Sequence, residues 1–255
     1  MSSDHVLVKT EDAFTTITMN RPERRNALSL DLLHQLTAAF RAAGDSDAGG
    51  VVLAANGPVF SSGHDFRDLA GADLASIREL LDVCTELMLT MQSIPQPVVA
   101  RVHGLATAAG CQLVATADLA VASTDAQFAT PGGKGGWFCH TPLVAVGRNV
   151  SRKRALELGL TGSTIDARTA FEWGLVNRVV PPGELDHATI ELLGRATRGS
   201  RSSKGLGKQT FYEQIGLDQR AAYERAVDVM ARSSQSPDAQ EAFAAFLDKR
   251  RPSFE

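Results

Sequence analysis

The sequence predicts an α/β protein that ends in a helical region. Short apolar runs alternate with helical periodicity up to about residue 180, and only helical patterns follow that point. The chain has 255 residues, of which 44% are hydrophobic and 22% are charged, so it can bury a large core. We expect an α/β core over residues 1–195 and a helical region over residues 196–255.

The first predicted elements are a strand pair and a helix. Residues 6–8 and 14–19 are apolar and β-branched, and the short segment between them predicts a hairpin. A polar loop follows over residues 20–26. Ser29 then has the side chain of a helix N-cap, and a stripe of leucines predicts a helix that ends at Gly44.

A buried strand and a long helix come next. Residues 50–55 are entirely small or apolar, which predicts a short strand. Asp73 is placed to cap a helix whose apolar and sulfur-bearing side chains recur at helical spacing. Pro95 and Pro97 end that helix just before the apolar run of residues 98–102.

Residues 98–123 form the segment around which the chain is organised. His103 and Gly104 interrupt the strand, small residues lead to a helix that begins at about Ala109, and residues 119–121 predict another strand. The first turn of a helix has unpaired N–H groups, and the helix dipole favours negative charge there. The segment is therefore half of an anion or oxyanion site, although small residues at such a junction also suit close packing.

A second exposed backbone donor is predicted after the strand at residues 50–55. Gly63 is the natural position for a positive φ angle, which turns the N–H of His64 outward. Two backbone donors would then follow two separate strands. A ligand oxygen could approach both of them closely.

The second half of the chain contains a glycine-rich stretch and several short helices. Residues 131–142 are dense in glycine, which predicts an irregular, mobile wall or lid. Ser151, Asp166 and Ser236 are predicted to cap the helices that follow them. Residues 176–180 predict a last short strand.

Composition excludes several classes of function. A formal net charge of −3 gives no reason to expect a nucleic-acid partner. No apolar run approaches the length of a membrane span, and the first ten residues lack a signal-peptide pattern, so we expect no membrane partner. Cys84, Cys111 and Cys139 are too scattered for a disulfide framework or a metal site. These features predict a cytoplasmic protein without a metal.

Several segments, taken in order, resemble the crotonase (enoyl-CoA hydratase/isomerase) superfamily. The matching segments are NRPERRNALS, FSSGHDF, VVARVHGLATAAGCQLVATADLAVAS, AQFATPG, EWGLVNRVV and AFLDKRRPSF. The resemblance implies a spiral of ββα units with a helical C-terminal trimerisation region. It also implies a homotrimer or homohexamer that acts on acyl-coenzyme A. No cofactor is implied, because coenzyme A enters as part of the substrate.

The resemblance assigns roles to individual residues. It implies that the backbone N–H groups of His64 and Ala109 bind the thioester oxygen as it becomes an enolate, which stabilises charge that develops in the transition state. The residues it implies for coenzyme A contacts are Arg24, Arg25, Ala27, Ser62, Asp65, Phe246 and Lys249. Lys249 corresponds to a lysine that reaches the nucleotide of a neighbouring subunit, and a solvated basic tail is the alternative for it. Trp137 and Phe138 are expected to line the acyl pocket or a subunit contact.

The sequence departs from this family at its two catalytic glutamates. Gln112 stands where the first glutamate belongs, and Gly132 stands where the second belongs. An amide is not a general base near neutral pH, and glycine has no side chain to offer. Standard hydration is therefore in doubt. Departures of this kind resemble the divergent enoyl-CoA hydratase domain-containing subgroup.

Other residues must then carry any proton transfer. Histidine titrates near neutral pH, so His64 and His140 are candidates, and we take His140 as the acid–base candidate in the glycine-rich stretch. A supporting role in a loop is the alternative for each. Isomerisation, decarboxylation, thioester hydrolysis and slow hydration all remain open as reactions. A non-catalytic acyl-CoA binding or scaffolding protein is the alternative function.

Overall fold

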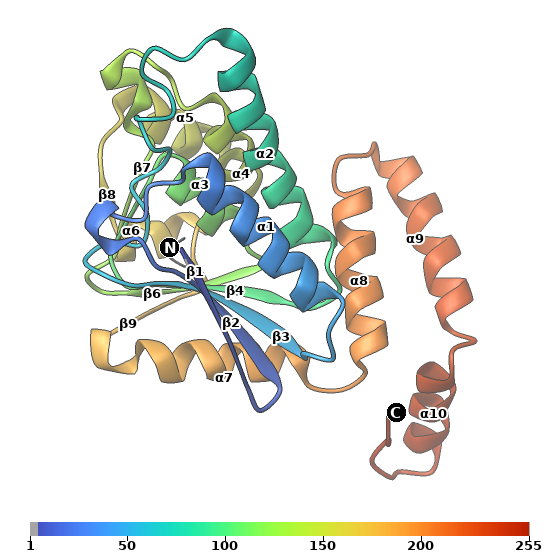
Figure 1. The fold of residues 1–255 in the computed structure, drawn as a ribbon. Helices are drawn as coiled ribbons and strands as arrows, with labels where there is room; N and C mark the ends of the chain where they lie inside the picture. The colour runs from blue at the N-terminus through green and yellow to red at the C-terminus, as the bar shows by residue number, and fades with distance from the viewer. Residues whose placement is uncertain (1–4, 255) are drawn as a thin grey trace.

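The computed structural model describes residues 5–254 and has the predicted α/β class with C-terminal helices (Figure 1). Residues 1–4 and residue 255, which the two predicted domain ranges include, lie outside the described part. The strands are β1 (Val6–Glu11), β2 (Phe14–Met19), β3 (Gly50–Ala55), β4 (Val98–Val102), β5 (Leu105–Thr107), β6 (Leu119–Ser123), β7 (Gln127–Ala129), β8 (Ile165–Asp166) and β9 (Arg178–Val180). The helices are α1 (Leu30–Gly44), α2 (Leu74–Ser93), α3 (Ala109–Thr116), α4 (His140–Asn149), α5 (Arg152–Thr161), α6 (Ala167–Trp173), α7 (Leu185–Thr197), α8 (Arg201–Gln214), α9 (Gln219–Ser233) and α10 (Pro237–Leu247).

A six-stranded sheet with the order β1-β2-β3-β4-β6-β9 forms the centre of the molecule. Its first two strands are the predicted antiparallel hairpin, and the pairs from β2 onward are parallel. A smaller sheet with the order β5-β7-β8 stands beside it. Because β5 starts shortly after β4 ends, the chain passes from one sheet to the other just before α3.

Helices cover both faces of the large sheet, with α1, α2 and α3 on one side and α7 on the other (Figure 1). Alternate residues of β3 therefore face different clusters: Leu53 lies in the main core, whereas Val52 packs with Leu185 and Leu193 of α7. This two-sided burial explains the uninterrupted apolar run of residues 50–55.

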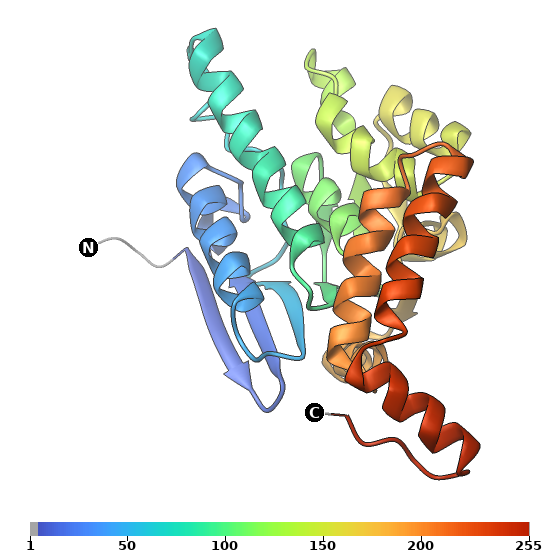
Figure 2. The same ribbon diagram turned by 90° about the vertical axis from the view of Figure 1, so that its right-hand side faces the viewer.

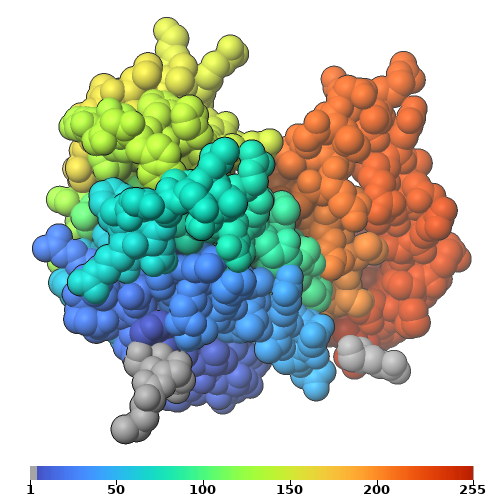
Figure 3. All heavy atoms as spheres, turned by 45° about the horizontal axis from the view of Figure 1, so that its top comes forward, coloured from blue at the N-terminus to red at the C-terminus, as the bar shows by residue number. Residues whose placement is uncertain are grey.

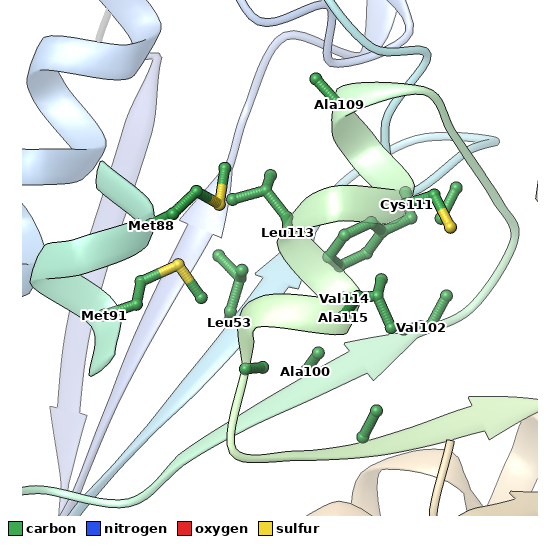
Figure 4. Close-up of a cluster of buried hydrophobic side chains, with 14 of the residues drawn as sticks. Leu53, Met88, Met91, Ala100, Val102, Ala109, Cys111, Leu113, Val114 and Ala115 are labelled. Carbon is green, nitrogen blue, oxygen red and sulfur yellow. The ribbon is translucent and has the colours of Figure 1, made fainter. Parts of the chain in front are cut away.

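Helix α3 is packed deeply against the sheet. Met88 and Met91 of α2 point toward Leu113 of α3 and Leu53 of β3 (Figure 4). The sulfur-bearing stripe of α2 is therefore a packing surface for α3, where flexible methionine side chains fill the space between helices. This packing holds the N-terminus of α3 in a defined place.

The predicted helix caps are mostly correct. Side chains that accept a hydrogen bond from the first turn of their helix are those of Ser29, Asp73, Asp166 and Ser236. Ser151 precedes α5, but its side chain makes no capping hydrogen bond, so that prediction is wrong. The last strand, β9, is also shorter than the predicted residues 176–180.

The glycine-rich stretch is more regular than predicted. Residues 131–142 contain a 3-10 helix, Pro131–Gly135, and then the start of α4. The N–H of Trp137 donates to the carbonyl of Gly132 at 2.9 Å, and Gly136 ends the 3-10 helix with a φ of 84°. The prediction of an irregular segment is wrong because these glycines permit tight backbone turns instead of preventing structure.

Helices α8, α9 and α10 form the C-terminal part of the chain (Figure 2). Lys208 of α8 is buried and lies 2.8 Å from Asp118, and it also donates to the carbonyls of Met91 and Gln96. These contacts attach α8 to the core. The predicted boundary at residue 195 falls in the last turn of α7, and the division into two regions stays a prediction. Within residues 5–254, no helix combines the length and apolar character needed to cross a membrane.

Candidate active site

The turns that follow β3 and β5 lie directly against each other. Gly63 has a φ of 87°, as predicted, and Ala108 has a φ of 51°. A Cβ atom on Gly63 would lie 2.9 Å from the Cβ of Ala108 and 3.4 Å from the backbone nitrogen of Ala109. The structure therefore brings together the two turns that precede the N–H groups of His64 and Ala109.

Hydrogen bonds fix both turns in place. The bonds run from Thr107 N–H to the carbonyl of Ser61 at 3.0 Å, from Leu28 N–H to Gly63 at 2.8 Å, from Asp65 N–H to Leu28 at 3.1 Å and from Ala108 N–H to Ala129 at 2.9 Å. Among the described residues, the N–H groups of His64 and Ala109 have no hydrogen-bond acceptor. Two neighbouring free amides, one of them at a helix N-terminus, can bind a single anionic oxygen.

Ala108 adopts a backbone conformation that non-glycine residues rarely occupy. Its φ of 51° is combined with a ψ of −120°. Such a conformation costs about 1–3 kcal/mol for an L-residue and persists only when surrounding contacts impose it. Sequence analysis missed this position because an alanine gives no signal for a positive φ.

A cavity of about 330 Å³ opens beside the two amides. It lies between the start of α2 and the residues around α4, which Figure 3 shows side by side on one face. Apolar and aromatic side chains make most of its wall: Phe66, Leu81, Pro131, Trp137, Phe138 and Pro142. Trp137 and Phe138 were expected to line such a pocket, whereas Phe66 and Leu81 were not identified. Among the described residues, no aspartate or glutamate lines the cavity.

The two positions of the missing glutamates differ in their surroundings. Gln112 lies in α3, is only 5% exposed, and its Oε1 has no hydrogen-bond partner. Gly132 lines the cavity, and a Cβ atom there would lie 2.1 Å from the carbonyl oxygen of Trp137 and 2.8 Å from the sulfur of Cys139. A side chain cannot be added at Gly132 unless the following turn moves.

Both candidate histidines line the cavity, but in different environments. Both ring nitrogens of His64 are buried without a hydrogen-bond partner, and the ring centroid lies 6.3 Å from that of Trp137. Burial lowers the pKa of His64, although the carbonyl of Leu28 and the carboxylate of Asp68 favour its charged form. The His140 side chain is exposed at the start of α4, and its ring lies 5.1 Å from that of Phe138.

The predicted coenzyme A contacts near the N-terminus form a compact polar loop. Asp65 is 3% exposed, and its carboxylate lies 3.1 Å from Arg24 and 3.4 Å from Arg21. Burial by itself raises the pKa of Asp65, but the N–H of Arg67 and the guanidinium groups of the two arginines lower it below its usual value. The carboxylate of Asp65 therefore holds the guanidinium group of Arg24 in a fixed orientation. Sequence analysis missed Arg21 because its partner lies 44 residues away.

The other predicted contacts lie in three different places. Arg25 is exposed and has a φ of 52°, Ala27 is buried, and Ser62 lines the cavity. Phe246 is 84% exposed on α10, and Lys249 is exposed just beyond it. Helix α10 lies far from α4 in space, at the lower right of Figure 1, whereas α4 lies in the upper part of the molecule. A single chain therefore does not bring these two residues to its own cavity, and their role stays a prediction.

Known proteins share this fold and sequence over nearly the whole chain. Residues 9–255 match the family described as enoyl-CoA hydratase/isomerase. The mitochondrial enoyl-CoA hydratase domain-containing protein 3 of Rattus norvegicus is 44% identical over 244 residues, which cover 95% of this chain and 81% of that protein. An enoyl-CoA hydratase structure from Mycobacterium smegmatis is 43% identical with a TM-score of 0.95, and covers 98% of this chain and 99% of its own. The human domain-containing protein 3 structure is 41% identical with a TM-score of 0.93 and the same coverage.

The fold and the matched residues define an enoyl-CoA hydratase-like protein. The chain belongs to the enoyl-CoA hydratase/isomerase family of the crotonase superfamily, and within it to the domain-containing subgroup. The predicted crotonase fold is thereby confirmed. The predicted cytoplasmic location is contradicted, because the vertebrate relatives are named as mitochondrial. The prediction relied on scattered cysteines, and free cysteines do not distinguish the cytoplasm from other compartments.

Proposed function

We propose that this chain is an enzyme that binds acyl-coenzyme A thioesters and stabilises a thioester enolate. The observation that carries the proposal is the pair of free N–H groups, at His64 and Ala109, beside an apolar cavity. Donors that are fixed before the reaction stabilise the charge that develops on the thioester oxygen, because they need no reorganisation. An acyl chain would occupy the cavity, whose wall is largely aromatic and aliphatic.

The reaction belongs to the lyase or isomerase class, with hydration as its least favoured member. Hydration needs groups that deliver water and a proton, and no carboxylate among the described residues lines the cavity. With crotonyl-CoA we therefore expect turnover well below about 10 per second, followed at the enoyl absorbance band. Turnover at an ordinary enzymatic rate would contradict this part of the proposal.

Coenzyme A itself is proposed to lie along the polar loop before α1. Arg24 and Arg25 would meet its phosphates, with Asp65 holding Arg24 in position through the 3.1 Å contact. The N–H of Ser62 donates to the carbonyl of Arg25 at 3.0 Å, so Ser62 lies beside this loop, and Ala27 and Ser62 complete the proposed surface. We propose no resident cofactor or metal.

The C-terminal helices are proposed to form contacts in a homotrimer or homohexamer. Exposed apolar side chains on α8, α9 and α10 include Phe211, Ile215, Val227, Met230, Phe243 and Phe246. Contact with another copy would cover such side chains, and would let Lys249 reach coenzyme A in a neighbouring subunit. Light scattering should give three or six times the chain mass. A species of single-chain mass would contradict both statements.

A non-catalytic acyl-CoA binding protein is the second candidate function. The observation that favours it is Gly132, which lines the cavity but has no room for a catalytic side chain. Both candidates require the same thioester binding. They differ in turnover.

Calorimetry with two matched ligands tests the shared part of the proposal. Butyryl-CoA should bind saturably, and the thioether analogue S-butyl-CoA, which lacks the carbonyl oxygen, should bind about tenfold more weakly, because two hydrogen bonds of about 0.5–1.5 kcal/mol each are lost. Equal affinities would contradict the assignment of the two N–H groups. No binding of either ligand would contradict the proposed function.

A further inference from the structure

We infer that the imidazole of His64 is the group that exchanges a proton with the acyl chain in this cavity. The residue would then act twice, with its backbone N–H on the thioester oxygen and its ring on a carbon-bound proton. This inference rests on the proposed function. It also replaces His140, the residue that the sequence pattern favoured.

The first argument is the state of the His64 ring. Buried polar atoms are nearly always hydrogen-bonded, yet neither nitrogen of this ring makes a well-formed hydrogen bond within the described residues, although the Leu28 carbonyl is near enough to favour a proton on the ring. His64 is one of the residues that line the cavity, and its ring centroid lies 6.3 Å from that of Trp137, another lining residue. A substrate in the cavity is therefore the natural partner for a ring nitrogen.

The second argument is position. The backbone nitrogen and the Cβ atom of His64 are bonded to the same Cα atom. A thioester oxygen held by that N–H thus lies within one side-chain length of the imidazole. The acyl Cα atom is bonded to the thioester carbon, so its protons come within the same reach.

The third argument is the weakness of the other candidates. Burial raises the pKa of Cys139, and its sulfur already accepts the N–H of Gly132 at 3.3 Å. The His140 side chain is exposed and packs on Phe138. The carboxylate of Asp65 is occupied by two arginines. Among the described cavity residues, His64 is the titratable group whose buried ring nitrogens make no well-formed hydrogen bond.

The surroundings of the ring suit a base. Burial is the largest influence and lowers the pKa of His64, while the carboxylate of Asp68 and the carbonyl of Leu28 act in the opposite direction. Asp68 is itself held by the N–H of Leu30 at 2.9 Å, so its charge is fixed near the ring. The imidazole is therefore neutral at pH 7 and ready to accept a proton.

The proposed step balances without any further reactant. A ring nitrogen takes a proton from the acyl Cα atom, and the C–H electron pair forms the enolate double bond. The carbonyl electron pair moves to the oxygen, where the N–H groups of His64 and Ala109 hold it. The imidazolium then returns a proton to the same carbon, or to another carbon of the acyl chain.

Exchange of the α-protons of butyryl-CoA in D₂O, followed by proton NMR, tests the step. We expect the wild-type protein to catalyse exchange, and His64→Gln to slow it by about 10²–10⁴-fold. The backbone N–H survives in His64→Gln and His64→Ala, so the Kd for butyryl-CoA should change less than about twofold, which is less than the loss of one hydrogen bond would cause. Added imidazole should partly restore exchange in His64→Ala. His34→Ala, an exposed histidine on α1, is the matched control and should behave as wild type.

The outcomes separate the inference from the proposed function. No binding of butyryl-CoA to the wild-type protein would overturn both. Binding without exchange, or exchange that survives His64→Gln and is lost in His140→Gln, would overturn the inference alone. If a variant does not fold, the pH profile of exchange by the wild-type protein provides the test: exchange should fall as pH drops through a single ionisation, whose pKa lies below the ordinary histidine value of 6.5. A flat profile would overturn the inference.

Discussion

Two glycine-bearing segments, one around Gly63 and one around Gly132, contribute residues to the wall of the cavity, and they need glycine for different reasons. Gly63 needs it for a φ of 87°, which places the N–H of His64 beside that of Ala109. Gly132 has an ordinary φ, but the carbonyl of Trp137 lies where its Cβ atom would be. The first segment presents a backbone donor, and the second is closed to a catalytic side chain. Glycine can therefore serve a site by adopting a backbone conformation that exposes an N–H group. It can also mark a position where no catalytic side chain fits.

This difference also decides which lost glutamate can be restored. Gln112 is isosteric with glutamate and sits in a helix, so Gln112→Glu changes the charge of a side chain that the fold already accommodates. Gly132→Glu must displace a backbone carbonyl.

The largest expected effect is that of a side chain at Gly132. Gly132→Ala should lower the free energy of unfolding by about 3 kcal/mol or more. The added methyl group would overlap backbone atoms, which can move aside only if the turn changes its conformation. Gly135→Ala is the matched control, because its Cβ atom would meet nothing within 4 Å. Urea denaturation of both variants provides the measurement. A Gly132→Ala protein as stable as the control would break the comparison between the two segments.

A smaller effect of opposite sign is expected at Ala108, which lies against Gly63. Ala108→Gly should raise the free energy of unfolding by about 1 kcal/mol, because glycine relieves the strain at a φ of 51°. Ala117→Gly, at an ordinary φ of −59°, should be destabilising by a similar amount. Thermal unfolding of the two variants distinguishes them. Destabilisation by Ala108→Gly would mean that the turn is not strained.

The smallest expected effect concerns pH. The pKa of His64 in the folded protein lies below its ordinary value of 6.5, so the unfolded chain binds a proton first as pH falls. Stability should therefore decline from about pH 6.5 down to the lowered pKa of the folded state. The wild-type protein should show this loss relative to His64→Gln in denaturant titrations over that window. Parallel curves would show that the ring is not desolvated.

Much of the fold was determined by local sequence patterns. The predictions of the hairpin, the apolar strand at residues 50–55, the caps at Ser29 and Asp73, and the positive φ of Gly63 all agree with the structure. These features depend on residues close together in the chain, through side-chain period, capping chemistry and the freedom of glycine. The absence of both glutamates is also a fact of the sequence.

Only the tertiary structure decided how distant segments meet. The φ of Ala108 is imposed by contacts with Gly63 and Ala129, and the space at Gly132 is taken by the carbonyl of Trp137. Asp65 became a partner of Arg21 and Arg24 across more than 40 residues. The isolation of the His64 ring is likewise a property of its packed surroundings. Local patterns specify conformations one segment at a time, whereas a site is made by the contacts between segments, which no single segment encodes.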